Sequence, residues 1–176
     1  MRRHLKQPLV QCCMILGLCV VFVSLLAHCT RSGKDSLAPD FTLKTLDDHE
    51  ITLSKLRGKV VLVDFWATWC GPCRESTPHL IQLYKTYREK GFEVIGMSLD
   101  KEDERETVSR FVKSMNVPYA VVIAPQEVAR NYGVAGLPTS FFIDREGRLR
   151  EKIPGFNSTI ARHMAVKVAE LISEKP

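Results

Sequence analysis

Residues 59–73, KVVLVDFWATWCGPC, join an apolar run to two cysteines that lie three positions apart. An apolar run of this length predicts a strand that is buried on both faces, as in a parallel sheet. The residues after Cys70 are expected to begin a helix, whose unpaired N–H groups and positive end favour a thiolate. The sequence therefore predicts a reactive cysteine pair at the junction of a buried strand and a helix.

The composition indicates one globular domain. The chain has 176 residues, of which 45% are hydrophobic, and this is enough to bury a core. The formal net charge is +5, but Arg2, Arg3 and Lys6 lie in a 29-residue segment without an acidic residue. The rest of the chain carries only +2, and no basic cluster is interleaved with aromatic residues. Nucleic acid is therefore not an expected partner.

The six cysteines fall into two groups. Four lie in the N-terminal segment, namely Cys12, Cys13, Cys19 and Cys29, and the other two are Cys70 and Cys73. No second pair is present to complete a zinc site, so neither a metal nor another cofactor is expected. A structural disulfide between Cys70 and Cys73 is the alternative, but closing so small a loop adds little stability.

Residues 63–73, VDFWATWCGPC, together with Pro78 and Gly136-Leu137-Pro138-Thr139, resemble thioredoxin. The opening Ala38-Pro39-Asp40-Phe41 and the long segment before Pro138 are more similar to the TlpA/ResA-type, AhpC/TSA-redoxin-like branch of that superfamily. The resemblance covers roughly residues 37–157. It implies a thioredoxin-like three-layer α/β fold, with a central mixed β-sheet flanked by helices. It also implies thiol–disulfide oxidoreductase activity on protein disulfides.

The other segments supply the rest of this fold. Residues 41–45 and 51–53 alternate in polarity around a turn and predict an extra N-terminal β-hairpin. Residues 101–123 predict a charged helix and a strand, the inserted helix–strand unit that resembles TlpA-type relatives. The remaining expected elements are a strand at 92–99, a helix at 126–132, paired strands at 139–143 and 148–153, and a last helix capped by Asn157 or Ser158. The thioredoxin-like domain is predicted to span residues 38–176.

Residues 1–29 predict a signal peptide or a membrane anchor. A basic start precedes an apolar run, and the positive-inside rule then sends the domain across the membrane. Residues 26–29 resemble a lipoprotein signal in which Cys29 is lipidated, although His28 is larger than the usual residue there. Lipidation and an uncleaved anchor both remain open, and residues 30–37 are expected to form a polar tether. The domain is expected on the periplasmic, extracytoplasmic side of the cell membrane.

The two cysteines of the motif are expected to have different roles. Cys70 should be the more exposed one and should attack the substrate disulfide as a thiolate. Cys73, one turn into the helix, should be buried and should resolve the mixed disulfide by attacking Cys70. Gly71 and Pro72 tune the stability of the thiolate, and this pair is the thioredoxin-like choice, which predicts a reductant.

Asp64 is an acidic residue in an otherwise apolar strand, six positions before Cys70. Burial without a partner should raise the pKa of its carboxyl group, which then suits a proton acceptor for Cys73. The alternative is an edge-strand aspartate that points into water. Thioredoxin has its buried acid at this spacing, whereas TlpA-type relatives often place a glutamate at the position of Ser76. The base is assigned to Asp64, and a role for Glu75 is left open.

Pro138 and Trp69 are the other predicted site residues. The Leu-Pro-Thr context implies a cis Pro138 opposite the dithiol, where neighbouring backbone groups pair with an extended substrate strand. The alternative is an ordinary proline that begins a strand. Trp69 is expected to flank the site and shield the sulfur, and Trp66 is expected to serve packing.

The resemblance also implies partners that the composition does not name. They are protein disulfides, such as those of the haem-attachment cysteines of apocytochrome c, and a membrane thiol transporter that returns electrons to the dithiol. A peroxiredoxin-like thiol peroxidase is an alternative, but the PxxxTxxC pattern expected before its cysteine is absent at Cys70. A non-enzymatic binding module on a thioredoxin scaffold is a further alternative, in which the disulfide has only a structural role.

Overall fold

A mixed five-stranded sheet forms the centre of the structure, a computed structural model that describes residues 36–174. Its strands lie in the order β5-β4-β3-β6-β7. They span Val60–Trp66 (β3), Phe92–Ser98 (β4), Ala120–Ile123 (β5), Thr139–Ile143 (β6) and Leu149–Pro154 (β7). Since β3 runs parallel to β4 and antiparallel to β6, it has a neighbour on each side and lies in the middle of the sheet.

Strand β3 is buried along its whole length, as its apolar sequence predicts. Side chains alternate between the two faces of a strand. Val61, Val63 and Phe65 therefore join the hydrophobic cluster on one face, and Leu62 joins the cluster on the other. The carboxyl end of this central strand lies where open α/β sheets have their active sites.

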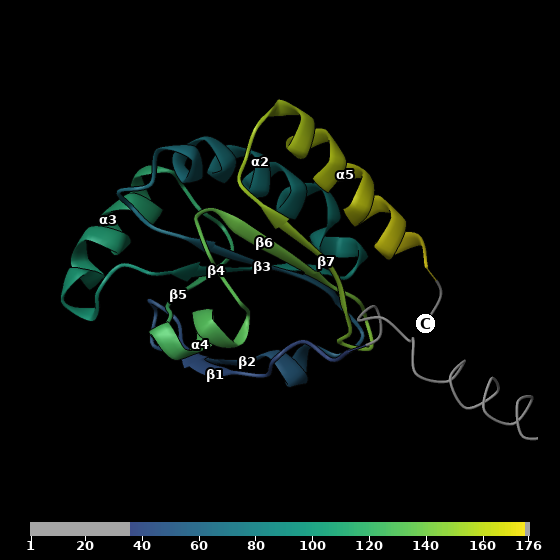
Figure 1. The fold of residues 1–176 in the computed structure, drawn as a ribbon, viewed down its shortest axis with the longest axis horizontal. Coiled ribbons are helices and arrows are strands. Elements are labelled where there is room, and N and C mark those ends of the chain that lie inside the picture. The colour runs from purple at the N-terminus through teal and green to yellow at the C-terminus, as the bar shows by residue number, and fades with distance from the viewer. Residues whose placement is uncertain (1–35, 175–176) are drawn as a thin grey trace, which may run out of the picture. The chain divides into compact units, whose positions relative to one another are not determined.

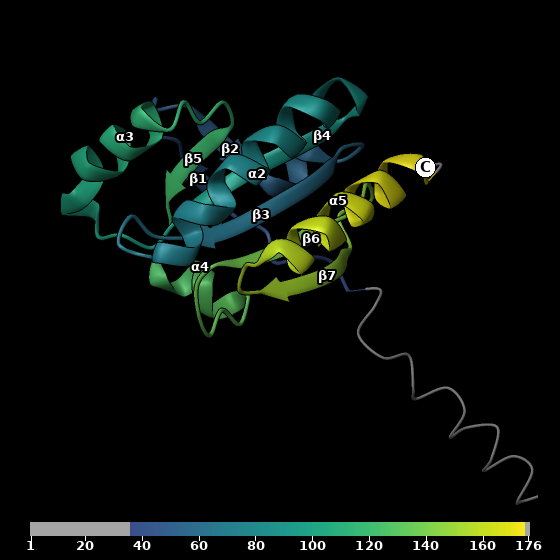
Figure 2. The same cartoon turned by 90° about the horizontal axis from the view of Figure 1, so that it is seen from above.

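Helices cover both faces of the sheet and produce three layers (Figure 1). Helices α2 (Gly71–Tyr87) and α5 (Ser158–Ser173) pack on one face, and Figure 2 shows them side by side over it. Helix α4 (Gln126–Asn131) and the N-terminal hairpin cover the other face. Helix α3 (Arg105–Ser114) contributes Phe111, whose ring packs 4.9 Å from that of Trp66. The predicted thioredoxin-like architecture is confirmed.

The predicted N-terminal hairpin consists of β1 (Thr42–Lys44) and β2 (Glu50–Thr52), which pair antiparallel. Its turn continues onto the edge of the main sheet, where the N–H of Leu46 donates to the carbonyl oxygen of Val121 at 2.9 Å. An isolated bridge between Thr45 and Val122 adds to this pairing. The hairpin thus protects edge strand β5, whose unpaired backbone groups would otherwise be open to other chains.

The ends of the helices follow the local sequence. Asn157 is the N-cap of α5, because its side chain accepts hydrogen bonds from the N–H groups of Thr159 and Ile160, both at 2.9 Å. This settles the choice between Asn157 and Ser158. After α2, the short 3-10 helix η2 (Arg88–Lys90) ends at Gly91, whose φ of 84° favours glycine. Two further 3-10 helices, η1 (Leu53–Leu56) and η3 (Glu102–Glu104), complete the structure.

The folded part begins slightly before the predicted domain start at residue 38. The N–H of Leu149 donates to the carbonyl oxygen of Ser36 at 2.9 Å, and Leu37 forms a bridge with Arg148. The last two residues of the predicted tether are therefore paired with the start of β7. The predicted signal peptide or anchor at 1–29, including Cys29, and the rest of the tether lie outside the described residues. Within residues 36–174, no helix combines the length and the apolarity needed to cross a bilayer.

Candidate active site

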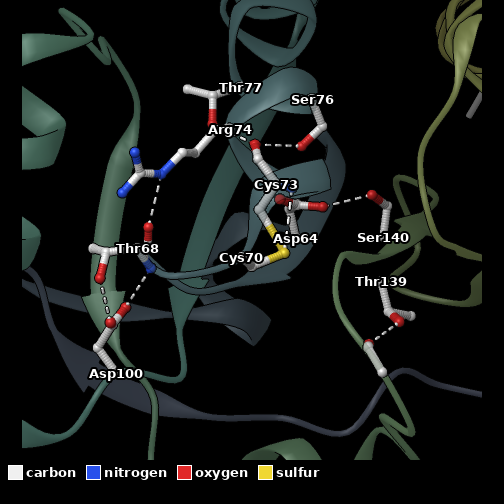
Figure 3. Close-up of a disulfide and its surroundings, with 11 residues drawn as sticks. Asp64, Thr68, Cys70, Cys73, Arg74, Ser76, Thr77, Asp100, Thr139 and Ser140 are labelled. Carbon is white, nitrogen blue, oxygen red and sulfur yellow. Dashed lines mark hydrogen bonds between the residues drawn. A yellow bond between two sulfur atoms is a disulfide. The ribbon is translucent and has the colours of Figure 1, made fainter.

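A disulfide joins Cys70 and Cys73 at the point where β3 gives way to α2. Cys70 is the N-cap residue of α2, and its Sγ accepts a hydrogen bond from the N–H of Cys73 at 3.3 Å. Figure 3 shows this disulfide at the start of the helix. The first N–H groups of a helix have no partner within the helix and carry its positive end. A negative charge on Cys70 would therefore be stabilised here after reduction.

The two cysteines differ in exposure in the predicted order. Cys70 is 6% exposed and Cys73 is fully buried. Gly71 and Pro72, between them, are exposed and form the first positions of α2. Of the two cysteines, only Cys70 therefore has surface in contact with solvent.

The two tryptophans of the motif are placed very differently. Trp66 is buried in the cluster that contains both cysteines, in agreement with its predicted packing role. Trp69 is 68% exposed, although it directly precedes Cys70. Its indole therefore offers an apolar surface at the rim of the site, and the shielding of the sulfur by Trp69 stays a prediction.

Asp64 lies in the central strand, so its alternative placement on an edge strand is wrong. Its side chain is 3% exposed, and its Oδ1 accepts a 2.6 Å hydrogen bond from the hydroxyl of Ser140. Burial raises the pKa of Asp64 to about 7, and the hydrogen bond from Ser140 opposes this rise. Near neutral pH the carboxyl group can therefore both accept and release a proton.

The alternation of β3 places Asp64 on the face covered by α2. Leu62 and Trp66, two positions away on either side, point to this same face. Leu62 lies in the cluster that contains Leu80 of α2, and Trp66 lies in the cluster that contains Cys73. Asp64 thus points toward the first turns of α2, on the face of the sheet where Cys73 lies.

Glu75, whose role the sequence left open, is exposed on the outer side of α2. Ser76 is buried, and its hydroxyl donates to the carbonyl oxygen of Cys73 at 2.9 Å. The hydroxyl of Thr77 donates to the same oxygen at 2.9 Å. Glu75 is therefore exposed to solvent, whereas Asp64 shares the buried side of α2 with Cys73.

Pro138 follows a cis peptide bond, as predicted, and is buried. Leu137 packs against the cluster that contains Cys70 and Cys73, so this loop borders the part of the core that holds the disulfide. The carbonyl oxygen of Pro138 already accepts a hydrogen bond from the N–H of Gly155 at 2.7 Å. Within residues 36–174, the N–H and C=O of Leu137 have no hydrogen-bond partner.

A buried network that the sequence analysis missed holds the turn before Cys70. Asp100 accepts hydrogen bonds from the N–H and hydroxyl of Thr68, at 2.9 and 2.6 Å, and from the hydroxyl of Ser98 at 2.7 Å. The Nε of Arg74 donates to the carbonyl oxygen of Thr68 at 2.9 Å (Figure 3). The turn is therefore tied both to the end of β4 and to α2. The signal available in the sequence was an acidic residue at the end of an apolar strand.

No group of three or more histidine, cysteine, aspartate or glutamate side chains suited to a metal ion occurs in the described part of the chain.

Residues 35–152 match the model of the AhpC/TSA family. The chain belongs to this family. The family match covers both cysteines, Asp64 and Pro138, so the whole site described above lies inside it.

Similar proteins place the chain more narrowly in the AhpC/TSA family. It is 40% identical over 124 residues to the thiol-disulfide oxidoreductase ResA of Bacillus thuringiensis, covering 70% of this chain and 69% of that protein. ResA of Geobacillus kaustophilus is 33% identical over 147 residues, covering 82% and 83%. A crystal structure from Chlorobium tepidum, described as a thiol:disulfide interchange protein DsbE, has a TM-score of 0.74 and 35% identity, covering 80% and 98%.

These relatives confirm the predicted assignment to the TlpA/ResA-type branch of the thioredoxin superfamily. They also confirm the predicted activity class, since the relatives are thiol-disulfide oxidoreductases and the Cys70–Cys73 pair is present here. This AhpC/TSA family member is an oxidoreductase that acts on protein disulfides.

Proposed function

We propose that the protein reduces disulfides in proteins outside the cytoplasm and is held at the membrane by its N-terminal segment. The observation that carries the reductive cycle is the position of Asp64, a buried carboxyl group with a raised pKa on the face of β3 that lies beneath Cys73. Such a group can take the proton of the resolving thiol at neutral pH.

In the first step, the thiolate of Cys70 attacks one sulfur of the substrate disulfide. A bond forms between Cys70 and that sulfur, and the substrate S–S bond breaks. The second substrate sulfur leaves with the electron pair and takes a proton from water. The helix N-terminus that caps Cys70 stabilises the attacking thiolate, and its partial exposure admits the substrate.

In the second step, the thiol of Cys73 gives its proton to Asp64 and attacks the sulfur of Cys70. The Cys70–Cys73 disulfide forms, and the remaining substrate sulfur leaves as a thiolate, which is protonated in turn. Two electrons pass from the enzyme dithiol to the substrate disulfide. Because Cys73 is fully buried, the sulfur of Cys70 is the one that it can attack.

The substrate is an extended protein segment rather than a small disulfide. Leu137, which borders the part of the core that holds the disulfide, has an N–H and a C=O without partners in the described part of the chain. These two groups can pair with the backbone of an added strand. The exposed indole of Trp69 supplies an apolar contact on the rim of the site.

The reduction potential is the first test of the proposed direction. We expect a value near that of thioredoxin, about −270 mV, because Gly71 and Pro72 form the same spacer between the cysteines. The measurement is equilibration of the full chain with dithiothreitol couples of known potential, followed by counting of free thiols. A potential above about −180 mV, in the range of isomerases and oxidants, would overturn the proposed direction.

The proposed location rests on the N-terminal sequence, and the proposed partners rest on the need of a disulfide reductant for electrons and substrates. A reductant outside the cytoplasm needs electrons from within, so a membrane thiol transporter is the proposed donor. Proteins that must keep paired cysteines reduced, such as apocytochrome c before haem attachment, are the proposed substrates. The basic start and apolar run of residues 1–29 supply the proposed membrane attachment.

Fractionation of cells that express the full chain tests the attachment. We expect the protein in the membrane fraction after a carbonate wash, with its domain open to protease added from the outer side. If Cys29 carries the lipid, the wild type incorporates a labelled fatty acid and Cys29→Ser does not, whereas an uncleaved anchor incorporates none in either protein. Recovery of the unmodified full chain in the soluble fraction would contradict the proposal.

A further inference from the structure

Ser140 is the residue that directly faces Asp64 across the sheet. The antiparallel register of β3 and β6 pairs these two residues, which places their side chains on the same face. The Ser140 hydroxyl donates to Oδ1 of Asp64 at 2.6 Å, and both side chains are buried. The bond is short, and its acceptor becomes charged when Asp64 ionises. Hydrogen bonds to charged groups are stronger than those between neutral groups.

Within residues 36–174, no other neighbour of Asp64 donates a hydrogen bond to its side chain. On the β4 side its register partner is Gly96, where an added Cβ would lie 3.1 Å from the indole nitrogen of Trp66. Tyr119 adds only a titratable phenol, whose pKa is raised by burial and by the charge of Asp64. On the α2 side, the alternation of β3 turns Asp64 toward the first turns of the helix, which carry Cys73. Within residues 36–174, the hydrogen bond from Ser140 is the one that Asp64 accepts.

We propose that Ser140 is a positioning residue for resolution: it holds one oxygen of Asp64 and leaves the other free to take the proton of Cys73. This inference rests on the proposed role of Asp64 as the base. The hydrogen bond from Ser140 reaches Oδ1 of Asp64, and Figure 3 shows it as a dashed line to one carboxylate oxygen. Within residues 36–174, Oδ2 accepts no hydrogen bond.

The position of Ser140 also links the base to the substrate loop. Ser140 lies two residues after Pro138, at the start of β6, and the loop before it borders the part of the core that holds the disulfide. The same short segment therefore presents the backbone of Leu137 to a substrate and the hydroxyl of Ser140 to the base. A substrate that pairs with this loop would bind to a strand already fixed to Asp64.

Replacement of Ser140 by alanine tests the inference through the pH profile of disulfide reduction. Without the hydroxyl, the charged form of Asp64 loses its hydrogen bond, so the pKa of Asp64 rises further. We expect the acidic limb of the profile to move upward by about one pH unit, which lowers the rate about tenfold at pH 6. Ser140→Thr, which keeps the hydroxyl, should restore the position of the limb.

Two controls separate this inference from the proposed base. In an Asp64→Asn background, Ser140→Ala should produce no shift, because the titrating group is gone. A loss of rate by equal factors at all pH values, or a failure of Ser140→Thr to restore the limb, would assign Ser140 a merely structural role. If Asp64→Asn leaves the acidic limb in place, Asp64 is not the base. If Asp64→Asn removes the limb but Ser140→Ala does not move it, Asp64 remains the base and Ser140 does not position it.

Discussion

Replacement of Cys73 by serine is expected to leave the protein covalently joined to its substrates. Cys70 keeps its place at the helix N-terminus and its access to solvent, so the first attack still occurs. A serine hydroxyl does not ionise at neutral pH and cannot displace a sulfur from a disulfide. The mixed disulfide therefore accumulates, and turnover in insulin reduction with dithiothreitol falls to the uncatalysed rate.

The measurement is non-reducing electrophoresis of cells that express Cys73→Ser, followed by mass spectrometry of the bands that disappear on reduction. The matched control is Cys70→Ser, which removes the attacking sulfur but keeps the buried one, and it should form no adducts. Adducts on Cys70→Ser but not on Cys73→Ser would reverse the roles of the two cysteines. Wild-type protein without insulin reductase activity, with a disulfide that resists mild reductant, would favour a scaffold function.

The second large effect is expected for Asp64→Asn, which keeps the shape of the side chain and removes its titration. The wild-type rate should rise with pH through the pKa of Asp64, about 7, because only the ionised carboxylate accepts a proton. The variant should lack this limb. Its rate at pH 7 should be about a hundredfold lower, at the low end of what general base catalysis contributes.

A control for Asp64→Asn is the rate in alkaline solution. There, water and hydroxide deprotonate Cys73 without help, so the rate of the variant should approach that of the wild type. Stopped-flow measurement of mixed-disulfide resolution across the pH range provides both observations. An unchanged rate and profile in the variant would remove Asp64 from the mechanism.

The same substitution should change the stability of the oxidised protein, and the direction follows from proton linkage. The folded-state pKa of Asp64 is about 7, above the ordinary value of 3.8 that the unfolded chain has. Between these values the folded state binds more protons, so its stability falls as pH rises through this window. The cost of ionising Asp64 in the folded state is about 4 kcal/mol above pH 7.

Asp64→Asn does not have this cost. Urea unfolding of oxidised wild type and variant should give similar free energies near pH 4. The variant should be more stable by several kcal/mol at pH 8. A difference that does not depend on pH would show that Asp64 is not buried with a raised pKa.

The elements of the fold could be predicted because their signals are local. The apolar run at 59–68 identifies a buried strand, the alternation at 41–45 identifies the hairpin, and a polar cap precedes the last helix. The order of the strands depends on contacts between distant residues and was not predicted; the resemblance implied only a central mixed sheet. Asn157 and Ser158 could not be separated in the sequence, because both residue types cap helices and only the observed hydrogen bonds decide between them.

The site residues that could be predicted are those that are unusual in their sequence context. Asp64 was recognised because a charge in an apolar strand is unusual, but its partner Ser140 lies 76 positions away and is an ordinary polar residue in sequence. Asp100 and Thr68 are 32 positions apart and meet only because β3 and β4 end side by side. Such pairs depend on strand register, which a single sequence does not contain.

Alkylation of the reduced protein tests whether the helix N-terminus makes Cys70 the reactive sulfur. The rate of reaction of each cysteine with iodoacetamide, followed against pH by mass spectrometry, reports how readily each thiol ionises. The account predicts that Cys70 reacts first and ionises at lower pH than an ordinary cysteine, while Cys73 stays protected. Ordinary alkaline ionisation of Cys70, or faster alkylation of Cys73, would contradict it.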